Sequence, residues 1–254
     1  MKRINHAQDL VQYQFEPEPG KAHGLNVYSL LTENHALLID TGYEEHAKLV
    51  LEDLHTRGYS VSQVVLSHFH PDHVFGLQAL KNVRVFGSEY YAGTLGKYPP
   101  ENQDPFMEIQ KLTDGARLQF GGFQLAFHSA PGHSPCSMYT VINDSFIHVA
   151  DTLIAANDGQ PICPFAEYEN IGEHILSLER LMEMSPQTLL LGHGKSIEGK
   201  TAIKEEITDR LIYLRAIRDS GGKISFKEAT IKCTCRFLNE QWHIQLTEEK
   251  LEQG

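Results

Sequence analysis

Short apolar runs separated by polar turn residues recur along most of the chain. Two of them, 25–31 and 35–40, flank the turn at 32–34 and predict a β-hairpin. The segment before them, 1–24, is polar and contains two prolines, so we expect it to be irregular. Further strands are predicted at 61–67, 83–86, 116–120, 123–129, 137–142, 146–150 and 188–191.

Helical spacing of apolar residues appears between these strands. Helices are predicted at 45–57, 73–80, 170–184 and 200–219, and further helix is expected up to the last residue. The stretch 88–114 predicts a helix followed by an irregular loop rich in aromatic residues, which is either a substrate cover or a packed surface loop. Strands interleaved with helices in this way are consistent with two packed sheets covered by helices.

The densest group of chemically active side chains follows the predicted strand 61–67. His68, His70, Asp72 and His73 lie within a single loop, and imidazole and carboxylate are preferred ligands of zinc and related metals. His68 and His70 are two residues apart and point to the same side of an extended segment, whereas Pro71 turns the chain before Asp72 and His73. One loop can therefore serve two adjacent metal ions.

A metal ion needs three or more protein ligands, so the rest of the chain must supply others. Three later segments each carry one candidate, placed just after an apolar run or beside a glycine. These candidates are His133 in PGHS, Asp151 in VADT and His193 in LGHG.

These motifs, taken in order, resemble those of the metallo-β-lactamase-fold hydrolases, and the resemblance spans roughly residues 20–195. The family's His-x-His-x-Asp-His signature is matched by His68, His70, Asp72 and His73. Its later ligands are matched by the candidates at 133, 151 and 193, and its early Asp-Thr-Gly by 40–42. The resemblance implies an α+β fold, namely a four-layer αββα sandwich with metals at one edge between the sheets. It also implies one domain over 1–254, with a core at about 20–195 and a helical C-terminal extension at about 196–254.

The same resemblance assigns roles to the candidate ligands. It implies that Asp151 bridges two divalent metal ions, most simply Zn²⁺ with Fe or Mn as alternatives, and that a bridging hydroxide is the nucleophile. Asp72 would orient this nucleophile as the catalytic carboxylate. Asp40 and Ser67 would hold imidazole rings by hydrogen bonds, although Asp40 can equally cap the turn at 41–42. The first ion would be bound by His68, His70 and His133, and the second by Asp72, His73 and His193.

Several aromatic residues flank the motifs and are candidates for the substrate pocket, although each is also a candidate core residue. They are Phe69, Phe75, Tyr98, Phe165 and Tyr168. Cys163 also lies close after Asp151 and is a candidate for the pocket lining. Histidines outside the motifs, such as His23 and His148, are expected to be ordinary surface or core residues.

Composition narrows the choice of partners. The net charge of -11 argues against a nucleic-acid-binding face, which is normally basic. No stretch approaches the length of a membrane span, and the first residues lack an apolar signal segment, so a cytoplasmic location is expected. The spacing of Cys233 and Cys235 fits neither a zinc knuckle nor a thioredoxin-like motif. We therefore expect a small-molecule substrate, with the oligomeric state left open.

Differences from neighbouring families narrow the choice among possible reactions. Flavodiiron oxygen reductases carry an acidic residue where this chain has His70, and the main β-lactamase subclass carries cysteine in place of Asp151. The pattern is nearest to the glyoxalase-II-like and lactonase-like branch, although 74–76 and Leu191 depart from its usual Gly-Gly and Pro. We expect a dinuclear hydrolase acting on a small ester, thioester or lactone. The alternatives are a mononuclear iron oxidoreductase of the persulfide dioxygenase kind, a phosphodiesterase or nuclease, and a binding module without catalysis.

Overall fold

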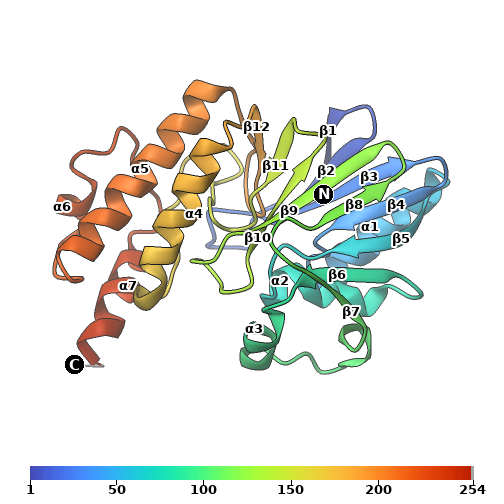
Figure 1. Ribbon diagram of the computed structural model, residues 1–254, viewed down its shortest axis with the longest axis horizontal. Helices are drawn as coiled ribbons and strands as arrows, with labels where there is room; N and C mark the ends of the chain where they lie inside the picture. The colour runs from blue at the N-terminus through green and yellow to red at the C-terminus, as the bar shows by residue number, and fades with distance from the viewer. Residues whose placement is uncertain (253–254) are drawn as a thin grey trace.

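The computed structural model describes the backbone of residues 1–252, and the side chains of these residues except 168 and 248–252. Within this part of the chain the strands form two sheets (Figure 1). The first has seven strands in sequential order: β1 (Lys2–Ala7), β2 (Leu10–Gln14), β3 (Asn26–Thr32), β4 (His35–Ile39), β5 (Ser60–Val65), β6 (Arg84–Ser88) and β7 (Ile109–Leu112). The second has six, in the order β13 (Ile197–Glu198), β12 (Thr188–Leu190), β11 (Phe146–His148), β10 (Met138–Ile142), β9 (Phe123–Ser129) and β8 (Arg117–Phe120).

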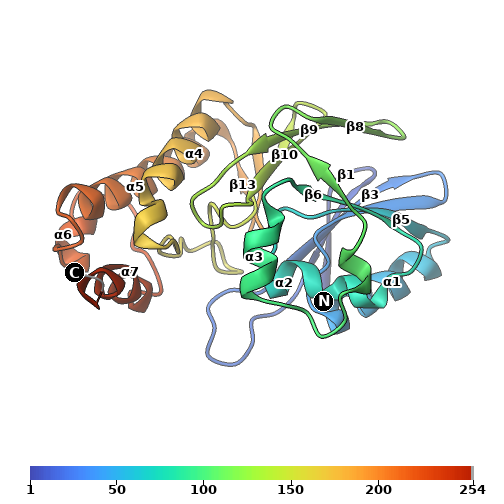
Figure 2. The same ribbon diagram turned by 60° about the horizontal axis from the view of Figure 1, so that its bottom comes forward.

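Helices cover the outer faces of both sheets (Figures 1 and 2). The first sheet is covered by α1 (Glu44–Thr56), α2 (Pro71–Val74), the 3-10 turn η1 (Phe75–Ala79) and α3 (Tyr91–Lys97). The second is covered by α4 (Ile171–Glu183) and α5 (Lys200–Asp219), with α6 (Phe226–Thr230) and α7 (Gln241–Glu252) beyond them. Two short 3-10 turns, η2 (Asp104–Phe106) and η3 (Tyr168–Asn170), complete the described elements.

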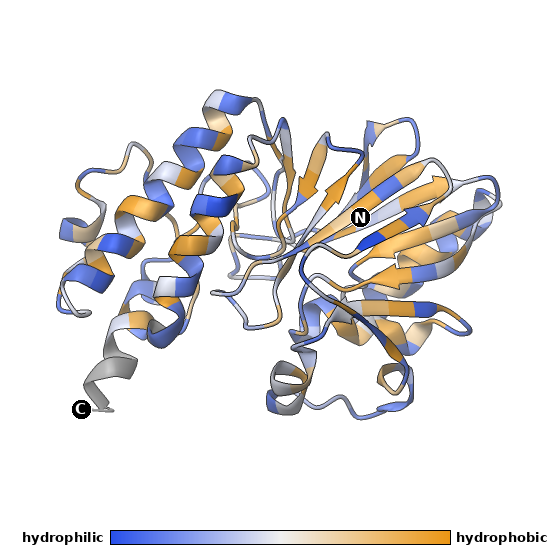
Figure 3. Ribbon diagram, in the orientation of Figure 1, coloured by the Kyte–Doolittle hydropathy of each residue, from blue (hydrophilic) through white to orange (hydrophobic). Residues whose placement is uncertain are grey.

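The period-two alternation of strand residues explains why the molecule has these layers. On β4, Leu37 and Ile39 face the second sheet, whereas Ala36 and Leu38 face α1. The strands are accordingly apolar along much of their length (Figure 3). One apolar core lies between the sheets and one beneath each layer of helices. The predicted α+β fold of αββα type with a helical C-terminal tail is therefore confirmed.

The prediction of an irregular segment at 1–24 is wrong for 1–14, whereas 15–24 indeed forms no helix or strand. Strands β1 and β2 form an antiparallel hairpin that begins the first sheet. The polar residues that hid this strand pair are buried and hydrogen-bonded: Gln12 Oε1 lies 2.7 Å from His6 Nε2, and Gln14 Nε2 donates to the Gly194 carbonyl at 3.2 Å. Strand β7 likewise lies inside the stretch predicted as a loop after α3.

No helix in the described part of the chain combines the length and the apolar character needed to cross a membrane. The long helix α5, for example, packs against α4 with one face and carries charged residues along the other.

Candidate metal centre

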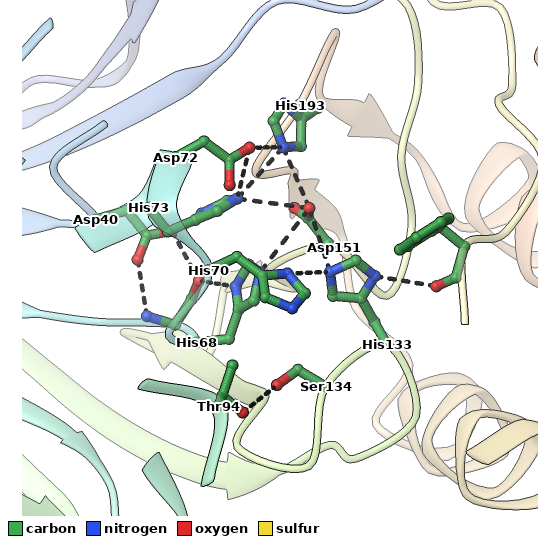
Figure 4. Close-up of polar contacts among 12 residues, drawn as sticks. Asp40, His68, His70, Asp72, His73, Thr94, His133, Ser134, Asp151 and His193 are labelled. Atoms are coloured by element: carbon green, nitrogen blue, oxygen red, sulfur yellow. Dashed lines mark hydrogen bonds and ion pairs between the residues drawn. The ribbon is translucent and has the colours of Figure 1, made fainter. Parts of the chain in front are cut away.

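Loops from both sheets meet at one edge of the sandwich and bring the predicted ligands together (Figure 4). The loop after β5 carries the cluster at 68–73, because the buried apolar end of that strand fixes where the loop begins. The second sheet supplies the remaining residues. His133 lies between β9 and β10, Asp151 follows β11, and His193 follows β12.

The first group of side chains consists of three histidines. His70 Nδ1 lies 3.1 Å from His68 Nε2 and 3.0 Å from His133 Nε2. The second group is mixed, because His193 Nε2 lies 3.3 Å from both His73 Nε2 and Asp72 Oδ2. Both groups have the donor types and the close spacing that a divalent metal ion requires.

Asp151 lies between the two groups. Its Oδ2 is 3.1 Å from His193 Nε2, 3.5 Å from His73 Nε2, 3.6 Å from His133 Nε2 and 4.0 Å from His68 Nε2. Its Oδ1 is buried and has no hydrogen-bond partner among the described residues. A buried carboxylate oxygen without a donor is costly, so this side chain fits a bridging position between two cations.

The outer nitrogens of the rings determine where the lone pairs point. Nδ1 of His73 donates to Asp40 Oδ2 at 2.8 Å, and Nδ1 of His193 donates to the Gly24 carbonyl at 2.9 Å. Nδ1 of His133 donates to the Phe165 carbonyl at 3.0 Å. Each ring is thereby oriented with its Nε2 towards the centre, which is the arrangement that metal-binding histidines use.

Asp40 organises the base of the centre. Its carboxylate is fully buried and accepts hydrogen bonds from the Ser67 backbone N–H at 2.8 Å, from Ser67 Oγ at 2.7 Å and from His73. The Ser67 hydroxyl in turn lies 3.1 Å from His68 Nδ1. The carboxylate is therefore directed at the ligand loop, and it does not cap the turn at 41–42.

Burial and charge divide the histidines into two classes. Burial lowers the pKa of His68 and His70, and it lowers the pKa of His133 to about 3, so these rings are neutral. For His193 the effect of burial is outweighed by Asp151 and Asp72, and its pKa rises to about 10. Asp151 and Asp72 likewise raise the pKa of His73 well above its usual value. Without a metal ion, His73 and His193 are therefore protonated, and a bound cation would displace the proton that faces it.

The predicted pocket residues occupy different environments. Phe69 is fully buried beside Tyr91 and does not line an open pocket, because its ring fills the space over Gly87 in the core. Phe75 is half-buried and packs against the same core. Tyr98 is 44% exposed with its ring centre 5.4 Å from that of His70. The side chain of Tyr168 lies outside the described part of the structure.

Two further residues near the centre do not follow from sequence motifs. His23 lies edge-on to His193 with ring centres 4.9 Å apart, and Trp242 lies 5.7 Å from His23. Neither belongs to a recognisable motif, and both reach the centre through long-range packing. Cys163, considered for the pocket lining, is instead buried in the core, where burial raises the pKa of its thiol to about 12.

Comparison with curated proteins finds distant relatives, several of which are hydrolases by name. The "Beta-lactamase-like protein 2 homolog" of Drosophila melanogaster is 22% identical over 189 residues, covering 72% of this chain and 62% of the relative. The "Atrochrysone carboxyl ACP thioesterase AacuM" of Aspergillus aculeatus is 29% identical over 178 residues, covering 68% and 52%. The "Hydroxyacylglutathione hydrolase" of Albidiferax ferrireducens is 28% identical over 142 residues, covering 53% and 49%. The chain thus spans about half to three-fifths of the length of these relatives.

Solved structures share the fold at low sequence identity. A metallo-β-lactamase from Pontibacter korlensis superposes with a TM-score of 0.68 at 19% identity, covering 84% of this chain and 98% of that one. A flavo di-iron protein from Thermotoga maritima gives a TM-score of 0.63 at 15% identity, covering 84% and 62%. The sequence model of the metallo-beta-lactamase superfamily matches residues 22–193, from just before β3 to the last histidine of the centre. With the sandwich fold and the converging histidines and aspartates, this match means that the chain belongs to the metallo-β-lactamase superfamily.

Proposed function

We propose that the protein is a dinuclear metal-dependent hydrolase that cleaves a small acyl thioester, with esters and lactones as chemically related substrates. The observation that carries this proposal is the overlap of three candidate ligand groups. Two of these groups share His68 and two share His73, and Asp151 belongs to the group between them. A purely structural zinc site has four protein ligands around one ion, and the candidate ligands here are more than four.

The residues fit a pair of divalent ions. Oδ1 of Asp151 accepts no hydrogen bond from the described residues, and the ring nitrogens within each group face one another at 3.0–3.3 Å. His68, His70 and His133 would hold one ion, Asp72, His73 and His193 the other, and Asp151 would contact both. Ions bound there would supply a nucleophile from water at neutral pH and polarise an acyl carbonyl.

Asp72 is the ligand best placed to orient a water molecule. Its side chain remains 29% exposed, whereas those of His73 and Asp151 are at least 95% buried. Burial alone would raise its pKa, but the positive charges of His73 and His193 lower it well below the usual value. The carboxylate is therefore ionised at neutral pH, so it can accept a hydrogen bond from a water molecule and orient it.

The choice of a thioester rests on the named relatives. The thioesterase of Aspergillus aculeatus and the hydroxyacylglutathione hydrolase of Albidiferax ferrireducens both carry names that refer to thioester hydrolysis. A thiol is a good leaving group, so the protein has to provide mainly a nucleophile and a stabilised oxyanion.

The test combines metal analysis with a substrate panel. Protein purified without chelator is expected to contain two divalent ions per chain and to hydrolyse an acyl thioester faster than a phosphodiester. Asp151→Asn and His68→Ala should each lose most of the activity and at least one ion, whereas the exposed Asp219→Asn should lose neither. A chain that binds no metal would contradict the proposal. One iron per chain with oxygen consumption on a persulfide would favour the oxidoreductase instead.

A further inference from the structure

A continuous arc of aromatic rings runs around one side of the candidate centre. His193 contacts His23 with ring centres 4.9 Å apart, and His23 contacts Trp242 at 5.7 Å. Trp242 contacts Phe165 at 5.2 Å, and Phe165 contacts His133 at 5.9 Å. The arc therefore extends from a histidine of the second ligand group to a histidine of the first.

Trp242 reaches this position because the C-terminal segment pairs with the loop that follows Asp151. The backbone N–H of Cys163 donates to the Leu238 carbonyl at 3.0 Å, and that of Leu238 donates to the Pro161 carbonyl at 2.9 Å. These bonds fix the start of α7 beside the centre. Trp242 itself lies outside residues 22–193, which match the superfamily, so the match assigns it no role.

The arc presents apolar surface to solvent at the mouth of the centre. Phe165 is 40% exposed, and Trp242 is half-buried against a small apolar cluster that includes Ala22 and Ile162. Tyr98, 44% exposed, stands edge-on to His70. Covering this exposed aromatic surface with an apolar group is favourable, because it removes apolar area from water.

The side of the centre next to Asp72 has a different character. A cavity there is lined by Asp72 and His193, by charged or polar side chains such as Glu18, Lys21 and His46, and also by His23 of the arc and by Phe15, Leu25 and Tyr43. The charged side chains of this cavity favour one orientation of a substrate that has one apolar end and one polar end. Its apolar end would lie on the arc and its polar end in this cavity.

We propose that Trp242 and Phe165 bind the apolar acyl group of the substrate and thereby select thioesters of alkyl acids longer than acetate. This inference rests on the proposed thioester hydrolysis and adds the acyl class to it. The thiol portion then lies toward Asp72, and the carbonyl carbon lies between the two ends.

The kinetic test compares two thioesters of N-acetylcysteamine that differ only in the acyl group. Wild-type protein should prefer the hexanoyl over the acetyl thioester in kcat/KM. Trp242→Ala should reduce this preference about tenfold, the effect expected for loss of one aromatic contact. Trp242→Phe should retain most of it. The control is Ile244→Ala, which alters the same helix at a side chain that is 47% exposed and lies outside the arc.

A second test measures binding without turnover. Trp242 is the only tryptophan in the chain, so the tryptophan emission reports on this site alone. The probe is a thioether ketone, S-(2-oxoheptyl)-N-acetylcysteamine, in which a methylene group separates the carbonyl from the sulfur and prevents hydrolysis. Its binding should shift the tryptophan emission to shorter wavelength as water leaves the ring. S-acetonyl-N-acetylcysteamine, which lacks the alkyl chain, should produce a much smaller shift.

The two tests separate this inference from the proposed function. If the protein hydrolyses both thioesters without preference and the long probe leaves the emission unchanged, the acyl-binding role of the arc is overturned while thioester hydrolysis stands. If neither thioester is hydrolysed, the proposed function fails. In that case an emission shift specific to the long probe still supports an apolar-ligand site at the arc, and its absence overturns the site.

Discussion

Asp40 joins two parts of the candidate centre through one buried carboxylate. It accepts hydrogen bonds from Ser67 and from His73, and its own backbone has a φ of 59°. Asparagine tolerates this left-handed conformation as well as aspartate does, so Asp40→Asn removes the charge without adding backbone strain. The substitution therefore isolates the contribution of the carboxylate.

We predict that Asp40→Asn weakens binding of the ion held by His73 by about 10- to 100-fold, the usual cost of losing a partner behind a metal-binding histidine. Competition with a coloured chelator measures this affinity. Asp219→Asn, at an exposed aspartate paired with Arg218, serves as the control. An unchanged affinity in Asp40→Asn would show that the carboxylate does not support the ligand.

Gly192 is required at its position by space, because a Cβ built on it would overlap with Asp151 Oδ1 and lie 2.9 Å from His73 Cε1. We predict that Gly192→Ala costs about 1–3 kcal/mol of unfolding free energy in the metal-free protein and reduces metal affinity as well. Urea unfolding in chelator and metal titration measure the two effects. Gly172→Ala on α4, where a Cβ meets nothing within 4 Å, should instead be neutral or stabilising. Normal metal binding in Gly192→Ala would contradict the steric argument.

At the scale of elements, α4 is fixed against the loop after Asp151 by a buried histidine. His174 Nε2 donates to the Thr152 carbonyl at 3.0 Å, and burial lowers the pKa of this ring to about 4. The unfolded chain gains a proton at this residue as the pH falls below about 6.5, whereas the folded protein does not. Stability provided by the neutral ring is therefore complete above pH 6.5 and is lost as the pH falls towards 4.

We predict that His174→Gln lowers stability at pH 7 but removes up to roughly 3 kcal/mol of the stability loss between pH 6.5 and 4. Urea unfolding of the chelated protein at several pH values measures the slope. His55→Gln, at an exposed histidine of α1, controls for the chemical change. Identical slopes in wild type and His174→Gln would mean that the buried ring does not titrate as described.

Helix α5 holds the C-terminal segment through a fully buried arginine. Arg210 Nη2 donates to the Ile154 carbonyl at 2.8 Å, Nη1 is paired with Glu206, and the guanidinium lies 5.6 Å from the Phe237 ring centre. Arg210 thus connects the loop after Asp151 with the segment that leads to Trp242. Loss of the cation leaves a partly buried carboxylate and an unpaired carbonyl.

We predict that Arg210→Ala destabilises the protein by about 3 kcal/mol and shifts the emission of Trp242 towards that of a hydrated indole. Arg215→Ala, on the same helix, removes an exposed pair with Glu179 and should cost at most about 1 kcal/mol. Denaturant unfolding followed by tryptophan fluorescence gives both quantities. Equal costs for the two arginines would contradict the role assigned to Arg210.

The sequence predicts most elements because their apolar periodicity is local. The strands around the His68–His73 loop and the helices α1, α4 and α5 are all recognisable in this way. The β1–β2 hairpin is not, because Gln14 is buried against the distant Gly194 carbonyl and Gln12 against Ser196 as well as its near neighbour His6. Trp242 is missed for the same reason, since its position depends on backbone pairing between residues 161–163 and 238.

At the scale of the whole molecule, the candidate centre is a joint between the two halves of the sandwich. The loop after β5 contributes ligands from the first sheet, and the loops after β11 and β12 contribute them from the second. Elsewhere the sheets meet through an apolar core that includes Leu37, Leu125 and Leu190. Bound ions would therefore cross-link the sheets at the edge where that core ends, and binding energy at the centre would stabilise the entire fold.

We predict that divalent ions raise the unfolding free energy by roughly 4 kcal/mol per site at a free concentration 1,000 times the dissociation constant. Thermal and urea unfolding with and without chelator measure this increment. Leu125→Ala, in the core between the sheets, should lower stability by about 2–5 kcal/mol in both conditions and leave the increment unchanged, because the two regions act independently. His133→Ala should do the reverse, with little loss in the metal-free protein and a clearly smaller increment. An increment of the same size in His133→Ala and in wild type would mean that the ions bind elsewhere and do not join the two sheets.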